Sequence, residues 1–196
     1  MSKLTWRGGN MLYPVPPVLV SCGCFDPETG MTDPKLYNVL TIAWTGTICS
    51  TPAMAFISVR PERHSYSIIK ESGEFVINLP TRQLVEAVDY AGVRSGKDED
   101  KFARCGLTPL KAKQVRCPLI SESPVNLECK VTRVIPLGTH DMFLAEVVAV
   151  HVDEALLDAN GKLDLAKADL LTYSHGEYFT LGDKLGSFGY SVKKTK

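Results

Sequence analysis

The chain has 196 residues, 44% of them hydrophobic, and its 22 acidic residues balance 22 basic ones. It is long enough to bury one sizeable core, so we expect a single domain over residues 1–196, with 1–13 as a candidate N-terminal arm. A formal charge of zero argues against nucleic-acid and anionic-membrane partners, because both favour a basic face.

Hydropathy and cysteine content indicate the cellular environment of the protein. The apolar stretches 52–59 and 145–152 are too short to span a bilayer, and no secretory signal opens the chain, so we expect a cytoplasmic protein. The six cysteines are then expected to be reduced, mostly buried thiols. Cys22 and Cys24 lack the two-residue gap of redox and zinc pairs, and a redox or iron–sulfur role for them stays as the alternative.

Strand signals dominate the chain. Runs rich in Val, Ile, Thr and aromatic residues predict strands over 18–22, 39–47, 53–59, 74–79, 125–135 and 142–152. Helices are predicted over 64–72, ended by Gly73, and over 81–91, capped by Thr81 and closed near Gly92. Segments 100–104 and 163–167 each predict one more turn. A meander of strands with two inserted helices predicts a closed or nearly closed antiparallel barrel.

Residues 38–65 are the richest in chemistry. An apolar run turns dense in hydroxyls around Gly46 and is followed by Arg60, Arg63, His64 and Ser65. Arginine grips phosphate through two parallel hydrogen bonds, and hydroxyls with free backbone amides complete a cradle. This pattern suits a flat polar ring with a phosphate tail. The chain has no Gly-x-Gly-x-x-Gly and no Walker loop, so a nucleotide would be held without those devices.

The same residues carry a family resemblance. Segment 38–61, Asn-Val-Leu-Thr-Ile-Ala-Trp-Thr-Gly-Thr-Ile-Cys-Ser-Thr-Pro-Ala-Met-Ala-Phe-Ile-Ser-Val-Arg-Pro, resembles the signature of the flavin reductase-like, FMN-binding split-barrel proteins, which include the flavoredoxins and an archaeal-type ferric reductase. Further matches follow in order at 74–78, 95–102, 138–141, 178–182 and 185–194. The resemblance implies a mainly β fold: an antiparallel, Greek-key-like FMN-binding split β-barrel with a few short inserted helices, forming a homodimer.

The resemblance also implies a set of FMN contacts. Backbone amides and small side chains would follow the isoalloxazine edge at Thr41, Ala43, Trp44, Thr45, Gly46 and Thr47, and the phosphate would be held by Ser58, Arg60, Arg63 and Ser65 at the start of a helix. Asn78 would donate to the ring, and Lys101 would belong to a lid-like segment. Structural alternatives remain open: Trp44 as a core residue, Thr45 and Thr47 as a solvent-facing pair, the arginines as a solvated helix cap, and Asn78 as a turn cap.

His140 is the candidate catalytic residue. It lies in Gly-Thr-His-Asp at 138–141, which partly matches a Gly-Asp-His motif of two-component flavin reductases; Thr139 replaces the Asp. Facing the flavin, His140 would position the nicotinamide of NADH or NADPH or polarise its carboxamide, and the alternative is an ordinary turn histidine. Hydride transfer itself requires no general base.

The expected activity follows from these assignments. We expect an FMN-binding oxidoreductase that reduces flavin with NAD(P)H and passes electrons to free flavin, a ferric chelate or a protein acceptor. The alternatives are a flavoredoxin-type carrier with tightly bound FMN and little NAD(P)H turnover, and a flavin-storage or sensing barrel. An aromatic and basic C-terminal cluster is expected to close the barrel and a dimer seam, or to reach a neighbour's site; it comprises Tyr173, His175, Tyr178, Lys184 and Tyr190.

Overall fold

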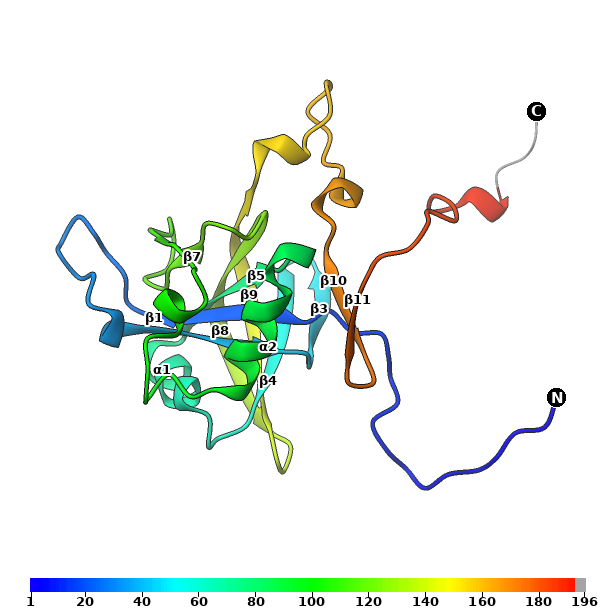
Figure 1. The fold of residues 1–196 in the computed structure, drawn as a ribbon, viewed down its shortest axis with the longest axis horizontal. Coiled ribbons are helices and arrows are strands. Elements are labelled where there is room, and N and C mark those ends of the chain that lie inside the picture. The colour runs from blue at the N-terminus through cyan, green and yellow to red at the C-terminus, as the bar shows by residue number, and fades with distance from the viewer. Residues whose placement is uncertain (193–196) are drawn as a thin grey trace.

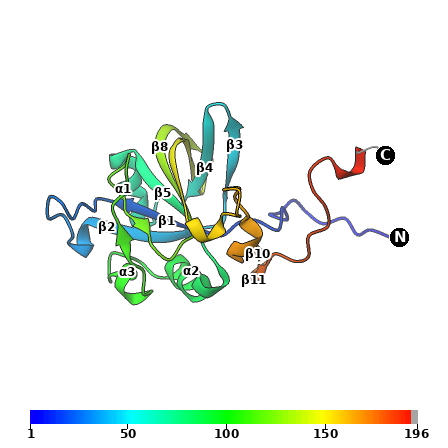
Figure 2. The ribbon, with the colours of Figure 1, turned by 90° about the horizontal axis from the view of Figure 1, so that it is seen from above.

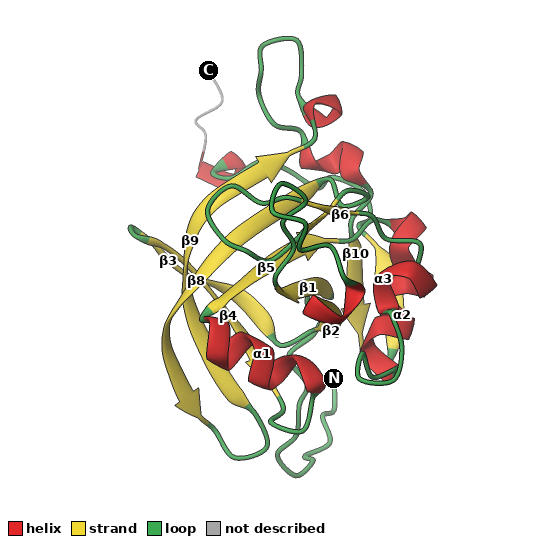
Figure 3. Cartoon of the chain, turned by 90° about the vertical axis from the view of Figure 1, so that its left-hand side faces the viewer, coloured by secondary structure: helices red, strands yellow, loops and turns green. Residues whose placement is uncertain are grey.

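A seven-stranded antiparallel sheet, coiled into a split barrel, forms the body of the protein (Figures 1 and 3). The structure is a computed structural model that describes residues 1–192; residues 193–196, with the end of the 185–194 motif, lie outside the described part. The strands are β1 (Val18–Gly23), β2 (Tyr37–Ile42), β3 (Thr45–Ser50), β4 (Ala53–Val59), β5 (Glu74–Leu79), β8 (Val125–Pro136) and β9 (Asp141–Val152). Their order, β2-β1-β5-β8-β9-β4-β3, confirms the Greek-key-like barrel and shows that the predicted simple meander is wrong.

The predicted strand over 39–47 is in fact two strands. β2 ends at Ile42 and β3 begins at Thr45, with Ala43 and Trp44 in a bend between them. In the sheet β2 pairs with β1, whereas β3 pairs with β4, so these two chain neighbours form opposite edges of the sheet. The Ser58 N–H donates to the Trp44 carbonyl at 2.9 Å and holds the bend against the end of β4. The barrel is therefore split where the chain bends.

The helices cover the two faces of β1 and β2. Alternate residues of β1 point inward, as Val18 and Val20 do, or outward, as Leu19 does. Helix α1 (His64–Ser72) adds Ile69 to the inner core and ends at Gly73, whose φ of 68° confirms the predicted stop. Helices α2 (Val85–Val93) and α3 (Lys101–Arg104) pack on the outer face (Figure 2).

The second helix differs from its predicted bounds. A short 3-10 turn, η2 (Arg82–Leu84), precedes α2, and Thr81 makes no side-chain cap. Gly92 lies inside α2 instead of ending it, and a Cβ there would come within 3.3 Å of the Thr41 Cβ, so this glycine lets the helix pack closely on β2. The predicted turn at 100–104 is confirmed as α3, with the Asp100 carboxylate accepting from the Ala103 N–H at 3.1 Å.

Several short elements were not predicted. They are β6 (Pro109–Leu110), β7 (Leu119–Ile120), β10 (Leu171–Ser174), β11 (Glu177–Thr180), η1 (Pro34–Leu36), η3 (Glu154–Leu156) and η5 (Tyr190–Val192); η4 (Leu165–Ala168) replaces the turn expected at 163–167. The β10–β11 hairpin turns through His175 and Gly176, with φ of 50° and 95°. Val15 exchanges two backbone hydrogen bonds of 2.9 Å with Tyr173, which ties the start of the chain to this hairpin.

The two ends of the chain project from the same side of the barrel (Figure 1). Residues 1–14 form no helix or strand, and the C-terminal segment leaves the hairpin after Thr180. Over residues 1–192 none of the helices combines the length and hydropathy that crossing a membrane requires.

Candidate cofactor site

Three adjoining cavities form one groove along the split of the barrel. The first, of about 330 Å³, lies between the start of α1 and the loop 94–96 that follows α2. The second, of about 140 Å³, lies between the bend of Ala43 and Trp44 and the end of β4, and the third, of about 350 Å³, lies between that bend and the β10–β11 hairpin. Thr41 lines all three, so the cavities adjoin one another around the end of β2.

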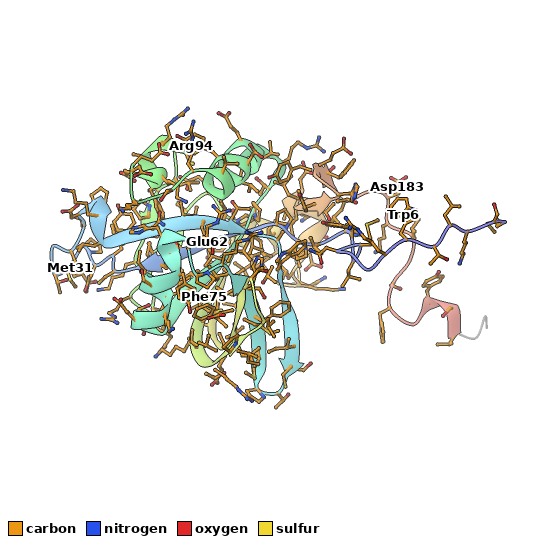
Figure 4. All side chains as sticks on the ribbon, turned by 90° about the horizontal axis from the view of Figure 1, so that it is seen from below. Trp6, Met31, Glu62, Phe75, Arg94 and Asp183 are labelled. Atoms are coloured by element: carbon orange, nitrogen blue, oxygen red, sulfur yellow. The ribbon has the colours of Figure 1, made fainter. Side chains whose placement is uncertain are left out.

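The first cavity is cationic. Arg60, Arg63, Arg94 and Lys101 line it, with Glu62 as its carboxylate; Figure 4 labels Glu62 near the start of α1 and Arg94 beyond the end of α2. The Arg60–Glu62 pair, at 3.4 Å, is half exposed and neutralises little. Helix α1 begins here with Arg63 as its N-cap and no side-chain cap, so first-turn N–H groups and the positive end of the helix dipole face the cavity. This geometry suits an anion.

Asn38 and Ser65 form the floor of the first cavity. Both are buried, and the Asn38 amide donates to the Ser65 Oγ at 2.7 Å. Because that bond uses an acceptor lone pair, the serine keeps its own hydrogen to donate. The loop 94–96 closes over Asn38 so tightly that a Cβ at Gly96 would lie 2.0 Å from its Oδ1. The sequence did not place Asn38, Arg94 or Gly96 among the predicted site residues, although Gly96 lies in the 95–102 motif.

Lys101 is buried between the first cavity and α2. Its Nζ donates to the carbonyls of Ala91 and Arg94 at 3.0 and 3.2 Å, and burial lowers the pKa of the ammonium to about 8. These carbonyls belong to the C-terminal end of α2, where the helix dipole is negative. Lys101 therefore fixes the loop and covers an end that would repel an anion.

The second cavity joins the bend to the turn between β8 and β9. Seven predicted residues line it, namely Thr41, Ala43, Trp44, Ser58, Arg60, Arg63 and His140. The Thr41 hydroxyl donates to the Val88 carbonyl at 2.5 Å and is therefore already used. Partial burial, and then the charge of Arg60, lower the pKa of His140 and favour its neutral imidazole.

Four predicted residues lie outside these cavities. Thr45, Gly46 and Thr47 follow β3 away from the groove, and the Thr45 hydroxyl donates across the pair to the Phe56 carbonyl at 2.6 Å. The buried Asn78 amide donates to the Leu19 carbonyl at 2.9 Å, and its Oδ1 accepts from the Ile120 N–H at 3.1 Å. The structure thus uses Asn78 to join three strands, and we leave these four out of the site.

The cysteines are free thiols, and three of them, Cys22, Cys117 and Cys129, are buried. Burial raises the pKa of Cys22 to about 11 despite its contact with Ser65, so this thiol stays protonated behind the first cavity. Among residues 1–192 no three His, Cys, Asp or Glu side chains converge in a way that could hold a metal ion.

The fold is that of the small split-barrel proteins, here with a cationic cavity at the seam of the barrel. Residues 11–182 match the family model described as the flavin reductase like domain, and the chain belongs to this family. An uncharacterized protein of Archaeoglobus fulgidus is 33% identical over 169 residues, which are 86% of this chain and 89% of that protein. Flavoredoxin of Desulfovibrio vulgaris (Miyazaki F) is 33% identical, covering 98% of this chain and 100% of its own, with a TM-score of 0.86. Flavoredoxin of Methanosarcina acetivorans is 26% identical, with the same coverage and a TM-score of 0.84.

Proposed function

We propose that the protein is an FMN-dependent oxidoreductase that takes reducing equivalents from NADH or NADPH and passes them to free flavin, a ferric chelate or a protein acceptor. The observation that carries the proposal is the cationic first cavity at the uncapped start of α1, directly beside the bend of Ala43 and Trp44. FMN carries a phosphate dianion joined by a short chain to a flat heterocycle. The cationic cavity suits the phosphate, and the neighbouring bend suits the heterocycle.

The residues of the groove fit FMN. Arg60 and Arg63 would hold the phosphate together with the Ser65 hydroxyl, which Asn38 leaves free to donate. Thr41 to Trp44 would follow the ring, and FMN, once bound, supplies the hydride and single-electron chemistry. His140, at the edge of the second cavity, would position the nicotinamide as a neutral donor or acceptor.

A flavoredoxin-type electron carrier is the second candidate function. It is supported by 33% identity to the flavoredoxin of Desulfovibrio vulgaris over 98% of this chain. Such a carrier would keep FMN tightly bound and exchange electrons with protein partners, with little turnover of NAD(P)H. The two candidates share the FMN site and differ only in how fast a nicotinamide nucleotide reduces it.

We also propose a homodimer. Large apolar side chains stand exposed on both projecting ends, with Trp6 at 75%, Leu185 at 91% and Phe188 at 106% relative exposure. Apolar side chains spread along extended ends gain most from burial against another surface, and a second copy supplies one. Analytical ultracentrifugation is expected to give twice the mass of one chain; a monomer at micromolar concentration would refute this part of the proposal.

Visible absorbance of the purified protein tests the function. Without oxygen, FMN-loaded protein is expected to bleach within seconds on addition of NADH or NADPH. Bleaching by dithionite alone would favour the carrier, and the absence of a flavin band after addition of FMN would refute both. Arg60→Ala combined with Arg63→Ala is expected to release FMN, whereas Arg82→Ala, which removes a surface arginine paired with Asp169, is the matched control.

A further inference from the structure

The third cavity has walls of a different chemistry from the first. Tyr13 from the N-terminal segment, Trp44 from the bend, and Tyr173 and Tyr178 from the hairpin line it. The Tyr13 ring centroid lies 6.2 Å from that of Trp44 and 6.0 Å from that of Tyr173, and the Tyr173 and Tyr178 centroids are 5.5 Å apart. Three segments far apart in the sequence thus build one aromatic wall.

The backbone fixes this wall in place. The paired hydrogen bonds between Val15 and Tyr173, at 2.9 Å each, hold the N-terminal segment on β10, two residues from Tyr13. The wall is thus preformed, with flat rings that lose little side-chain entropy when a ligand packs on them.

Charge separates the two ends of the groove. Among residues 1–192, Asp89 is the one charged residue that lines the third cavity, and its Oδ1 accepts a hydrogen bond from the Tyr178 hydroxyl at 3.2 Å. Burial, and then the neighbouring Asp89, raise the pKa of Tyr178 to about 12, so the phenol stays protonated. An anion is therefore attracted to the first cavity and repelled from the third, where aromatic rings and phenol hydroxyls favour an uncharged flat molecule.

We infer that the third cavity binds an uncharged quinoid electron acceptor, next to the flavin that the proposed function places along Thr41 to Trp44. The cavity shares Thr41, Ala43 and Trp44 with the second one, so the two ligands would be neighbours. The reaction balances: the nicotinamide nucleotide loses a hydride, solvent supplies one proton, and the quinone becomes a hydroquinone. The inference rests on the proposed function and narrows its acceptor, because a multiply anionic ferric chelate would be repelled by Asp89.

Equilibrium dialysis on the FMN-loaded, oxidised protein tests the inference without turnover. The probes are 2,3-dimethyl-1,4-naphthoquinone, whose methylated ring resists addition of thiols, and its 6-sulfonate. We expect the uncharged quinone to bind at least tenfold more tightly than the sulfonate. Tyr13→Ala is expected to weaken the binding of the uncharged quinone about tenfold. Asp89→Asn is expected to reduce the ratio of the affinities for the uncharged quinone and the sulfonate about fivefold.

Leu12→Ala is the matched control, because Leu12 is the exposed neighbour of Tyr13 and does not line the cavity. Equal affinity of wild-type protein for the two probes, or no effect of Tyr13→Ala and Asp89→Asn, would overturn the inference. Release of flavin by the quinone would overturn it as well, because the third cavity would then belong to the flavin. The flavin band of each dialysed sample reports FMN occupancy separately, and its absence from wild-type protein would count against the proposed function instead.

Discussion

Gly96→Ala should disable the first cavity without touching any of its charges. The new Cβ would lie 2.0 Å from Oδ1, 2.5 Å from Cγ and 2.7 Å from Nδ2 of Asn38. The amide cannot turn away freely, because its Nδ2 donates to the buried Ser65 Oγ at 2.7 Å. Either the loop 94–96 moves outward or the Asn38–Ser65 bond breaks.

The size of the effect on FMN affinity follows from the interactions that are lost when the loop moves or the Asn38–Ser65 bond breaks. A buried donor left without its acceptor costs about 1–3 kcal/mol, and overpacking costs a similar amount. If the loss falls on the bound state, about 1.4–2.8 kcal/mol corresponds to a ten- to hundredfold weaker affinity for FMN. Asn38→Ala removes the obstructing amide, so Gly96→Ala should cost much less in that background, with a coupling of about 1 kcal/mol or more.

These affinities form a double-mutant cycle of wild type, Gly96→Ala, Asn38→Ala and the double variant. Each is measured by titrating the apoprotein with FMN and monitoring the quenching of flavin fluorescence. Urea unfolding of the four apoproteins separates loss of affinity from loss of fold. Gly182→Ala is the control, because a Cβ there meets nothing within 4 Å. An affinity of Gly96→Ala within twofold of wild type, with Asn38 intact, would refute the role of the Asn38–Ser65 pair and the loop in holding the phosphate.

Three further predictions concern Lys101, Glu128 and His140. The folded pKa of Lys101, about 8, lies below its ordinary 10.5, so between these values Lys101 binds fewer protons in the folded apoprotein than in the unfolded chain and contributes stability that rises with pH. The buried thiols of Cys22, Cys117 and Cys129, whose pKa values are raised, act in the opposite direction in both proteins, so urea unfolding at pH 8 and 10 should show wild type gaining stability relative to Lys101→Met. Glu128→Gln should lower the free energy of unfolding by about 2–3 kcal/mol. Because hydrogen bonds lower the folded pKa of this carboxyl, the stability difference between wild type and variant should shrink in thermal melts as the pH drops below 4.5. His140→Ala should lower the rate of flavin reduction by NAD(P)H, measured by stopped flow, by a larger factor than it lowers the affinity for FMN. Equal factors would make His140 a structural turn residue.

The sequence predicts most strands and misses one break for a physical reason. Most of residues 39–47 are β-branched or aromatic and favour β structure, and no Pro or Gly marks the end of β2 at Ile42. The break arises because β2 pairs with β1 and β3 pairs with β4 on the far edge, which is a choice of partner made by the whole sheet. By contrast, the β10–β11 hairpin was detectable, since Gly176 lies in a two-residue turn between two short runs that contain Thr and aromatic residues.

The site shows the same division between local and distant information. Nine of the thirteen predicted residues line the first two cavities, because the resemblance carries residue types together with their order. The tyrosine wall of the third cavity combines Tyr13 with Tyr173, which lie at opposite ends of the chain and meet only through the Val15–Tyr173 backbone pair. No local pattern predicts that contact.

Three buried polar residues in strands show why burial alone does not identify a functional group. Glu128 accepts N–H bonds from Lys113, Gln114 and Val115 at 2.6–2.9 Å, and thereby ties a loop to the barrel. Asn78 uses both ends of its amide to join strands. Asn38 differs because its partner, Ser65, lines a cavity and keeps a hydrogen to donate. In sequence all three are polar residues in apolar strands, and only the position of the bonded partner separates Glu128 and Asn78, which join structural elements, from Asn38, which positions a hydroxyl lining the first cavity.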